Sequence, residues 1–182
     1  KISWTSTQDI APDKTEFSVS NIQLHDISTG VFKVVTDSSY NFVARDWTID
    51  FYANLLAYNL SNNGVIFHAA GSSDEIKLSL DNKGYPILLV KGSIGADEAI
   101  GSWPAPLNKE SLISISKRDN YLSASIDGEL NALVRSASIG NINLDGNAIY
   151  IGSDSALGNP AHMKIDELRI EASAASLSNY AQ

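Results

Sequence analysis

Cysteine is absent from the 182 residues of the chain. Its absence excludes disulfides, thiolate nucleophiles and zinc–thiolate sites, although it does not fix the cellular compartment. Basic residues are also few, because 13 Lys and Arg stand against 21 Asp and Glu, for a formal net charge of −8 at pH 7. This negative charge repels phosphates and anionic lipid headgroups, so neither nucleic acid nor a membrane surface is an expected partner.

Long apolar runs are missing as well. No stretch reaches the roughly 18 residues of a membrane-spanning helix, and residues 1–7 lack the apolar centre of a signal peptide. The length fits one domain, and 43% hydrophobic with 19% charged residues is the composition of a folded, soluble protein. We therefore expect a single domain over residues 1–182, excised from a larger protein, with no membrane insertion.

Apolar and polar residues alternate with a period of two along much of the chain. From Trp47 to Leu55 every second residue is apolar, which indicates a strand with one face on a core. The same alternation recurs at 76–80 and 121–126, and the Asp127-Gly128 pair predicts a tight hairpin into a strand at 130–135. Further strands are expected at residues 17–24, 30–35, 64–69, 86–90, 112–117, 148–152 and 164–172.

Around ten short strands separated by turn signals predict an all-β antiparallel sandwich or barrel. In the last strand the apolar phase changes, since Met163 and Ile165 lie on one phase while Leu168 and Ile170 lie on the other. We infer a β-bulge near Asp166 or, as the alternative, a strand that is buried on both faces.

Catalytic signatures are missing from the chain. The seven Glu residues are scattered, and no run of carboxylates at alternating strand positions supplies the acid and nucleophile of a retaining glycosidase. His25, His68 and His162 show neither the spacing of a helical zinc site nor an obvious nucleophile nearby. No glycine-rich segment carries the lysine and following helix of a phosphate loop. We therefore predict a protein with no catalytic residues, which is not an enzyme.

Seven segments follow one another in a characteristic order and separation: Asp46–Asn54, Gly64–His68, Ile76–Gly84, Leu112–Arg118, Tyr121–Leu130, Ile149–Ser153 and Ile165–Ile170. The ordered set resembles the concanavalin A-like superfamily, specifically its laminin G-like (LamG-like) branch, over about residues 17–176. The turn at Ile126-Asp127-Gly128 and the closing run from Ile165 are the most telling pieces. The resemblance implies a jelly-roll sandwich of two antiparallel sheets, usually a non-catalytic module for glycan or protein recognition, often stabilised by calcium.

Calcium is the cofactor that the resemblance implies. In similar folds an aspartate at the place of Asp166 in the closing strand helps to hold a structural ion. The acidic, loop-rich chain offers the carboxylate and carbonyl oxygens that this hard cation takes. The chain departs from the usual pattern at Lys164, where a Gly commonly precedes the Ile-Asp-Glu run. The alternative is that Asp166 caps the bulge or pairs with Arg169 or Lys164.

Two segments combine the residue types of a sugar site, where an aromatic face packs on a pyranose and short polar side chains satisfy its hydroxyls. Residues 91–104 read as a long, flexible loop that ends at a tryptophan, and residues 154–162 form the opposite wall. As the alternative, the tryptophan plugs one end of the core. The candidate ligand-binding residues are Trp103, Asp97, Glu98, Asp154, Asn159 and His162.

Three functional hypotheses follow from these observations. The first is a lectin-like, carbohydrate-binding domain of a secreted or surface protein, with a glycan or cell-surface receptor as its partner. The second is a protein-contact, adhesion or spacer domain of a virion fibre or bacterial adhesin that binds no sugar. A glycan-active hydrolase is the third and would need a carboxylate pair about 5–10 Å apart. The first two place the protein outside the cell, at a cell surface or on a virion.

Overall fold

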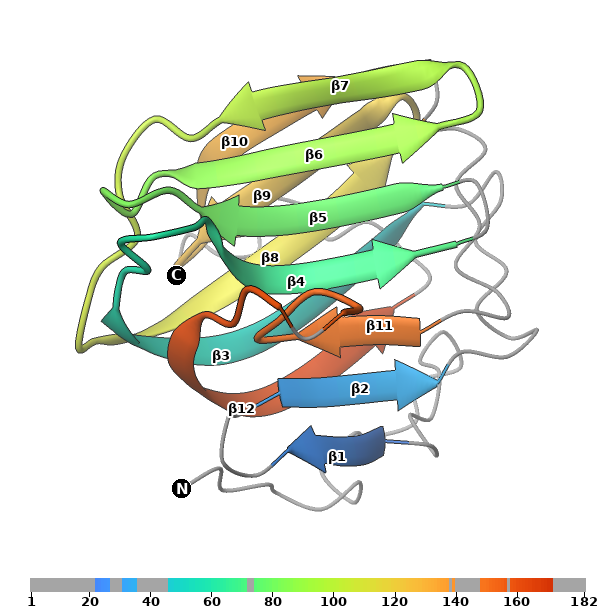
Figure 1. Cartoon of the computed structure of the whole chain (residues 1–182). Helices are drawn as coiled ribbons and strands as arrows, with labels where there is room; N and C mark the ends of the chain where they lie inside the picture. The colour runs from blue at the N-terminus through green and yellow to red at the C-terminus, as the bar shows by residue number, and fades with distance from the viewer. Residues whose placement is uncertain are drawn as a thin grey trace.

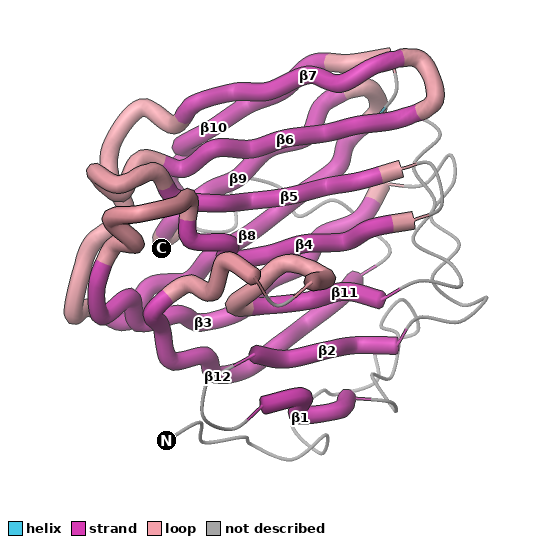
Figure 2. The backbone as a smooth tube through the Cα atoms, viewed as in Figure 1, coloured by secondary structure: helices cyan, strands magenta, loops and turns pink. Residues whose placement is uncertain are grey.

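The computed structural model describes residues 22–26, 31–35, 46–71, 74–137, 139, 148–156 and 158–171. Within these ranges the chain forms strands and connecting turns (Figure 2). The strands are β1 (Ile22–Asp26), β2 (Val31–Val35), β3 (Trp47–Ala57), β4 (Gly64–Ala70), β5 (Glu75–Leu80), β6 (Pro86–Gly92), β7 (Gly95–Ile100), β8 (Glu110–Arg118), β9 (Tyr121–Ile126), β10 (Glu129–Arg135), β11 (Ala148–Ile151) and β12 (His162–Glu171).

The strands form two antiparallel sheets that stack face to face as a sandwich (Figure 1). One sheet has seven strands in the order β1-β2-β11-β4-β5-β6-β7, and the other has five in the order β10-β9-β8-β3-β12. Chain neighbours such as β4, β5 and β6 pair directly, whereas β11 returns from late in the chain to lie between β2 and β4. The expected all-β sandwich of two antiparallel sheets is confirmed.

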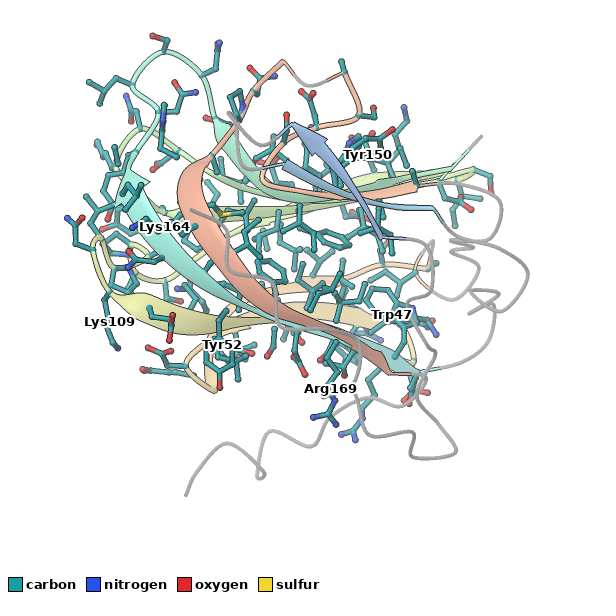
Figure 3. All side chains as sticks on the ribbon, turned by 90° about the horizontal axis from the view of Figure 1, so that it is seen from below. Trp47, Tyr52, Lys109, Tyr150, Lys164 and Arg169 are labelled. Carbon is teal, nitrogen blue, oxygen red and sulfur yellow. The ribbon has the colours of Figure 1, made fainter. Side chains whose placement is uncertain are left out.

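The core lies between the sheets and is built by the alternation that the sequence shows. In β3 the side chains of Trp47, Ile49 and Phe51 are fully buried. They belong to one apolar cluster with residues of the opposite sheet, among them Phe67 and Leu88. Side chains at the alternate positions point outward from the sandwich, as do Tyr52 on the five-stranded sheet and Tyr150 on the seven-stranded sheet (Figure 3). Burial of this apolar surface is the main source of stability.

The predicted hairpin at Asp127-Gly128 is confirmed and joins β9 to β10. Both residues have positive φ, 52° and 79°, as a type I′ turn requires. The Asp127 carboxylate also accepts hydrogen bonds from the Leu112 backbone N–H at 2.9 Å and the Lys109 ammonium at 2.6 Å. It therefore fastens the turn to the start of β8.

The expected bulge in the last strand is also confirmed. The register of β12 against β3 shifts between Asp166, opposite Tyr52, and Leu168, opposite Phe51. One extra residue on β12 explains why the apolar phase changes there. The other predicted strands agree with β2 to β6 and with β8 to β12 to within a few residues, whereas β1 begins at Ile22 and residues 17–21 of its predicted range lie outside the described residues.

The interpretation of residues 91–104 as a long, flexible loop is wrong. Gly92 and Gly95 face each other across a tight turn, and β7 pairs with β6 through to Ile100, which lies opposite Ile87. β7 is an edge strand whose side chains are mostly exposed, so it lacks the apolar alternation by which the other strands were found. In the described part of the chain, no helix is long and apolar enough to cross a membrane.

Candidate functional site: a polar groove on the seven-stranded sheet

A groove of about 410 Å³ lies on the outer face of the seven-stranded sheet. Strand β5 forms part of its floor. Ile76, Leu78 and Leu80 are buried in the core, so the intervening side chains, Lys77 and Ser79, face outward into the groove. The groove is lined by Ser61, Asn62 and Asn63 of the β3–β4 loop, by Val65, Lys77 and Ser79 of β4 and β5, and by Asp154 and Asn159 of the β11–β12 loop.

The β11–β12 loop folds back over the sheet beside β4 (Figure 1). Its residues Asp154 and Asn159 form one wall of the groove. The base of the loop is closed by the Ala161 N–H, which donates to the Gly152 carbonyl at 2.9 Å. The Gly152 N–H donates in turn to Ile66 of β4, and the Val65 N–H donates to the Asn159 carbonyl. Backbone bonds therefore hold the two ends of the loop, and side chains must hold its middle.

Asp154 organises the middle of the loop. Its Oδ1 accepts the backbone N–H groups of Ala156 and Gly158, at 3.1 and 2.8 Å, and its Oδ2 accepts the Asn159 amide at 2.8 Å. Burial acts to raise the pKa of this carboxyl, but the three hydrogen bonds outweigh that effect and hold the pKa below its usual range. Asp154 is therefore ionised at neutral pH.

The wall opposite is the β3–β4 loop, which is shaped by Asn59. The Oδ1 atom of Asn59 accepts the backbone N–H groups of Ser61 and Asn62, at 3.1 and 3.2 Å, in a local Asx turn. This turn presents the Asn62 and Asn63 side chains at the groove, where both are exposed. Short amide and hydroxyl groups therefore face the groove from both walls.

The charge of the groove is close to balanced. Lys77 supplies an ammonium on the floor, and its Nζ lies 3.5 Å from the Glu75 carboxylate. The other charged group in the lining, Asp154, has both oxygens engaged within its own loop. Uncharged polar groups therefore dominate what the groove offers to a ligand.

The structure brings together two of the sequence-predicted ligand residues, Asp154 and Asn159. It does not bring the others to the groove. His162 is exposed at the start of β12, opposite Ala57. Asp97 and Glu98 are exposed on edge strand β7, at the far side of the sheet from β11.

Trp103 lies in the β7–β8 connection, where it is partly buried and packs against the core cluster. Its carbonyl accepts a hydrogen bond from the buried Asn131 amide of β10 at 3.0 Å. Packing on the core is what the plug, the alternative left open by the sequence, requires of the indole. None of the described residues that line the groove is aromatic.

The proposed calcium ligand, Asp166, has a described backbone at the β12 bulge, but its side chain lies outside what the structure describes. Over the described ranges, no three His, Asp or Glu side chains come together as a metal site.

Five polar lining residues were missed by sequence reasoning: Ser61, Asn62, Asn63, Lys77 and Ser79. The alternation in β5 already placed Lys77 and Ser79 on its outer face. Their convergence with a loop about 80 residues further along the chain has no local signal, because it depends on β11 pairing with β4.

Comparison with solved structures places the fold in a class of antiparallel sandwiches found in toxin binding domains. No family model matches the chain, and no curated protein matches it either. The binding domain of Paraclostridial Mosquitocidal Protein 1 is similar, with a TM-score of 0.67 and 17% identity over 82% of this chain and 39% of that one.

Two botulinum neurotoxin structures are also similar. The binding domain of botulinum neurotoxin DC in complex with SialylT has a TM-score of 0.62 and 16% identity over 87% of this chain. Botulinum neurotoxin type C, which depends on interaction with two ganglioside molecules to enter cells, has a TM-score of 0.61 and 13% identity over 87% of this chain. The chain spans about two fifths of each of these neighbours.

Proposed function

We propose that the domain is a non-catalytic recognition module that binds a carbohydrate in the groove on its seven-stranded sheet. The observation that carries this proposal is the convergence of amide, hydroxyl and ammonium groups from three separate segments on one groove of about 410 Å³. Ligand sites commonly have volumes of about 300–1,000 Å³. Short amide and hydroxyl side chains both donate and accept, as the hydroxyls of a sugar require.

A neutral sugar suits this groove better than an acidic one. The Lys77 ammonium is partly neutralised by Glu75, and Asp154 adds a second negative charge to the site. A sialic acid carboxylate would therefore meet little net positive charge. The described lining also holds one carboxylate only, Asp154, whereas most glycoside hydrolases use a pair, which supports binding without catalysis.

The structural neighbours support the general class of this proposal. One was solved with SialylT, and another depends on two ganglioside molecules. We propose by analogy that this chain acts on an outer cell surface as part of a larger secreted or surface protein. We also assign the sandwich to the LamG-like branch of the concanavalin A-like superfamily, since the ordered motifs of the sequence fall on paired strands.

Groove variants test this function. Lys77→Ala and Asn63→Ala each remove a polar group that faces the groove, so each should weaken binding of a neutral glycan about tenfold. Lys83→Ala and Asn82→Ala are the matched controls, because both residues are exposed in the β5–β6 turn outside the lining. The measurement is binding to an array of neutral and sialylated oligosaccharides. If the groove variants and the controls bind alike, the groove is not the site.

A protein-contact domain is the second candidate function. It is favoured by large apolar side chains that are exposed at two neighbouring edge strands: Ile94 in the β6–β7 turn, Ile100 in β7, and Leu130 and Leu133 in β10. Such edges are suited to association with another protein. Failure of the wild-type domain to bind any glycan on the array would favour this function.

Calcium is part of the proposal as a structural ion held by Asp166. At the β12 bulge the residue between Asp166 and Leu168 has no cross-strand partner in β3, so an unpaired stretch of backbone lies beside this aspartate. Backbone carbonyls and a carboxylate are suitable calcium ligands. Excess calcium should therefore raise the melting temperature of the wild-type domain relative to a chelator, and Asp166→Asn should abolish the difference. Equal melting temperatures of the wild type in both conditions would contradict the proposal.

A further inference from the structure

His68 lies beneath the wall of the groove that the β11–β12 loop forms. It sits on the outer face of β4, yet it is only 5% exposed, because that loop covers it. Its Nδ1 accepts the backbone N–H of Ser155 at 2.9 Å, and its Nε2 lies 3.2 Å from Glu75 Oε1. Since Nδ1 is an acceptor here, the ring is neutral and carries its proton on Nε2, which donates to Glu75.

A protonated ring cannot make both of these bonds. Protonation places a hydrogen on Nδ1, where it would face the Ser155 N–H, and two donors would then meet with no acceptor between them. The hydrogen bond to Glu75 would remain and become stronger. Protonation therefore destabilises the contact between His68 and the loop, and not the contact within the sheet. Ser155 directly follows Asp154, the residue that organises the loop.

The closed loop also buries one polar group that has no hydrogen-bond partner in the described part of the chain. Ser153 is fully buried, and its Oγ has no hydrogen-bond partner among the described residues. An unsatisfied buried hydroxyl costs free energy in the closed form, which exposure to water would recover. The closed position therefore depends on the few bonds that hold it, and the His68–Ser155 bond is one of them.

We propose that protonation of His68 releases the middle of the β11–β12 loop, around Asp154 and Ser155, from β4, so that this wall of the groove opens and the groove gives up its ligand in mild acid. This inference rests on the proposed carbohydrate-binding function for its last step only. The release of the loop is a property of the fold and can be measured without a ligand.

Four side chains lie around His68: Glu75 and Lys77 of β5, Asp154 of the β11–β12 loop and Tyr150 of β11. Burial lowers the pKa of His68 below its ordinary value of 6.5, and the Lys77 ammonium of β5 acts in the same direction. The carboxylates of Glu75 and Asp154 oppose this lowering without cancelling it. From β11, the Tyr150 ring lies 6.5 Å from the imidazole, centroid to centroid.

The sign of the pH dependence follows from these groups. A histidine with a lowered pKa in the closed form binds its proton more readily in the open form, where water reaches it. Closure is therefore most favourable well above pH 6.5 and weakens as the pH falls through that value toward the lower pKa of the closed form. Each further pH unit favours opening by up to about tenfold until the pKa of the closed form is reached.

Amide hydrogen exchange of Ser155, followed by NMR on the whole chain between about pH 7.5 and 5, tests the release of the loop. After correction for intrinsic exchange, opening of the wild-type loop should increase as the pH falls below 6.5. His68→Asn keeps an acceptor near the Ser155 N–H but never titrates, so its loop should not respond. His162→Asn removes an exposed histidine outside the groove and should retain the response. Constant protection in the wild type, or the same response in His68→Asn, would overturn the proposal.

Binding to the same array of neutral and sialylated oligosaccharides at both ends of this pH range separates the two proposals. Binding that is lost in acid by the wild type and retained by His68→Asn supports both. If the loop opens in acid but no glycan binds at any pH, release of the loop by protonation of His68 is supported and the carbohydrate function is not. Equal binding at both pH values would support the carbohydrate function and refute the proposed release of the ligand in mild acid.

Discussion

Gly84→Ala is expected to destabilise the domain by about 3 kcal/mol, with a fall of about 6–12 °C in Tm. Gly84 has a φ of 89°, which costs an L-residue free energy wherever it occurs. An added Cβ would also lie 2.2 Å from Cζ and 2.5 Å from Cε1 of the Tyr58 ring. Tyr58 cannot easily turn aside, because its hydroxyl donates to the Ala105 carbonyl at 2.5 Å.

The size of this effect reflects the place of Gly84 in the fold. Its carbonyl accepts the Ala105 N–H at 2.8 Å, so this glycine, Tyr58 and Ala105 tie together the β3–β4, β5–β6 and β7–β8 connections. Burial, and then the nearby Asp81 carboxylate, raise the pKa of Tyr58, so the phenol remains a donor at neutral pH. Loss of this arrangement would loosen one end of the sandwich, including the loop that forms a wall of the groove.

A double-mutant cycle separates the two causes. Thermal and denaturant unfolding of Gly84→Ala, Tyr58→Ala and the double variant gives the coupling between the added methyl group and the ring. The cost of Gly84→Ala should be smaller in the Tyr58→Ala background, because only the backbone strain remains. Tyr58→Phe, which removes the hydroxyl alone, should cost about 1 kcal/mol. An unchanged cost in both backgrounds would mean that the ring plays no part.

The sequence predicted most of the fold because the information is local. Alternation from Trp47 to Leu55 identifies β3 and its buried face, and the phase change before Leu168 identifies the bulge in β12. The Asp127-Gly128 pair predicted the β9–β10 turn from the backbone freedom that a type I′ turn requires. Strand β7 was missed because the side chains of this edge strand are almost all exposed, so it has no apolar alternation to detect.

The candidate site was predicted only in part because it is assembled from distant segments. Asp154 and Asn159 were found as polar residues in one loop, and they do meet there, at 2.8 Å. Lys77 becomes their neighbour only because the sheet places β5 beside β4 and β4 beside β11. His68 gave no signal in the sequence, since the loop that covers it begins more than 80 residues later.

Trp103→Ala is expected to cost about 2–3 kcal/mol of stability, somewhat less than a fully buried aromatic residue. The indole is partly buried on the core cluster, so its removal leaves a gap at the end of the sandwich. The Asn131 amide bonds to the Trp103 backbone carbonyl, which the substitution keeps, and the loss should therefore come from packing. Denaturant unfolding measures the cost, with Ser102→Ala, at an exposed neighbour, as the control.

The same variant decides what Trp103 does for the protein. Because the groove is lined by other residues, glycan binding by folded Trp103→Ala should match that of the wild type at a temperature well below both melting transitions. The two roles predict different effects of the substitution. If Trp103 packs in the core, Trp103→Ala lowers stability, and if its ring contacts the sugar, Trp103→Ala lowers glycan affinity. If binding disappears while stability is unchanged, the β7–β8 connection carries the ligand and the groove beside Lys77 does not.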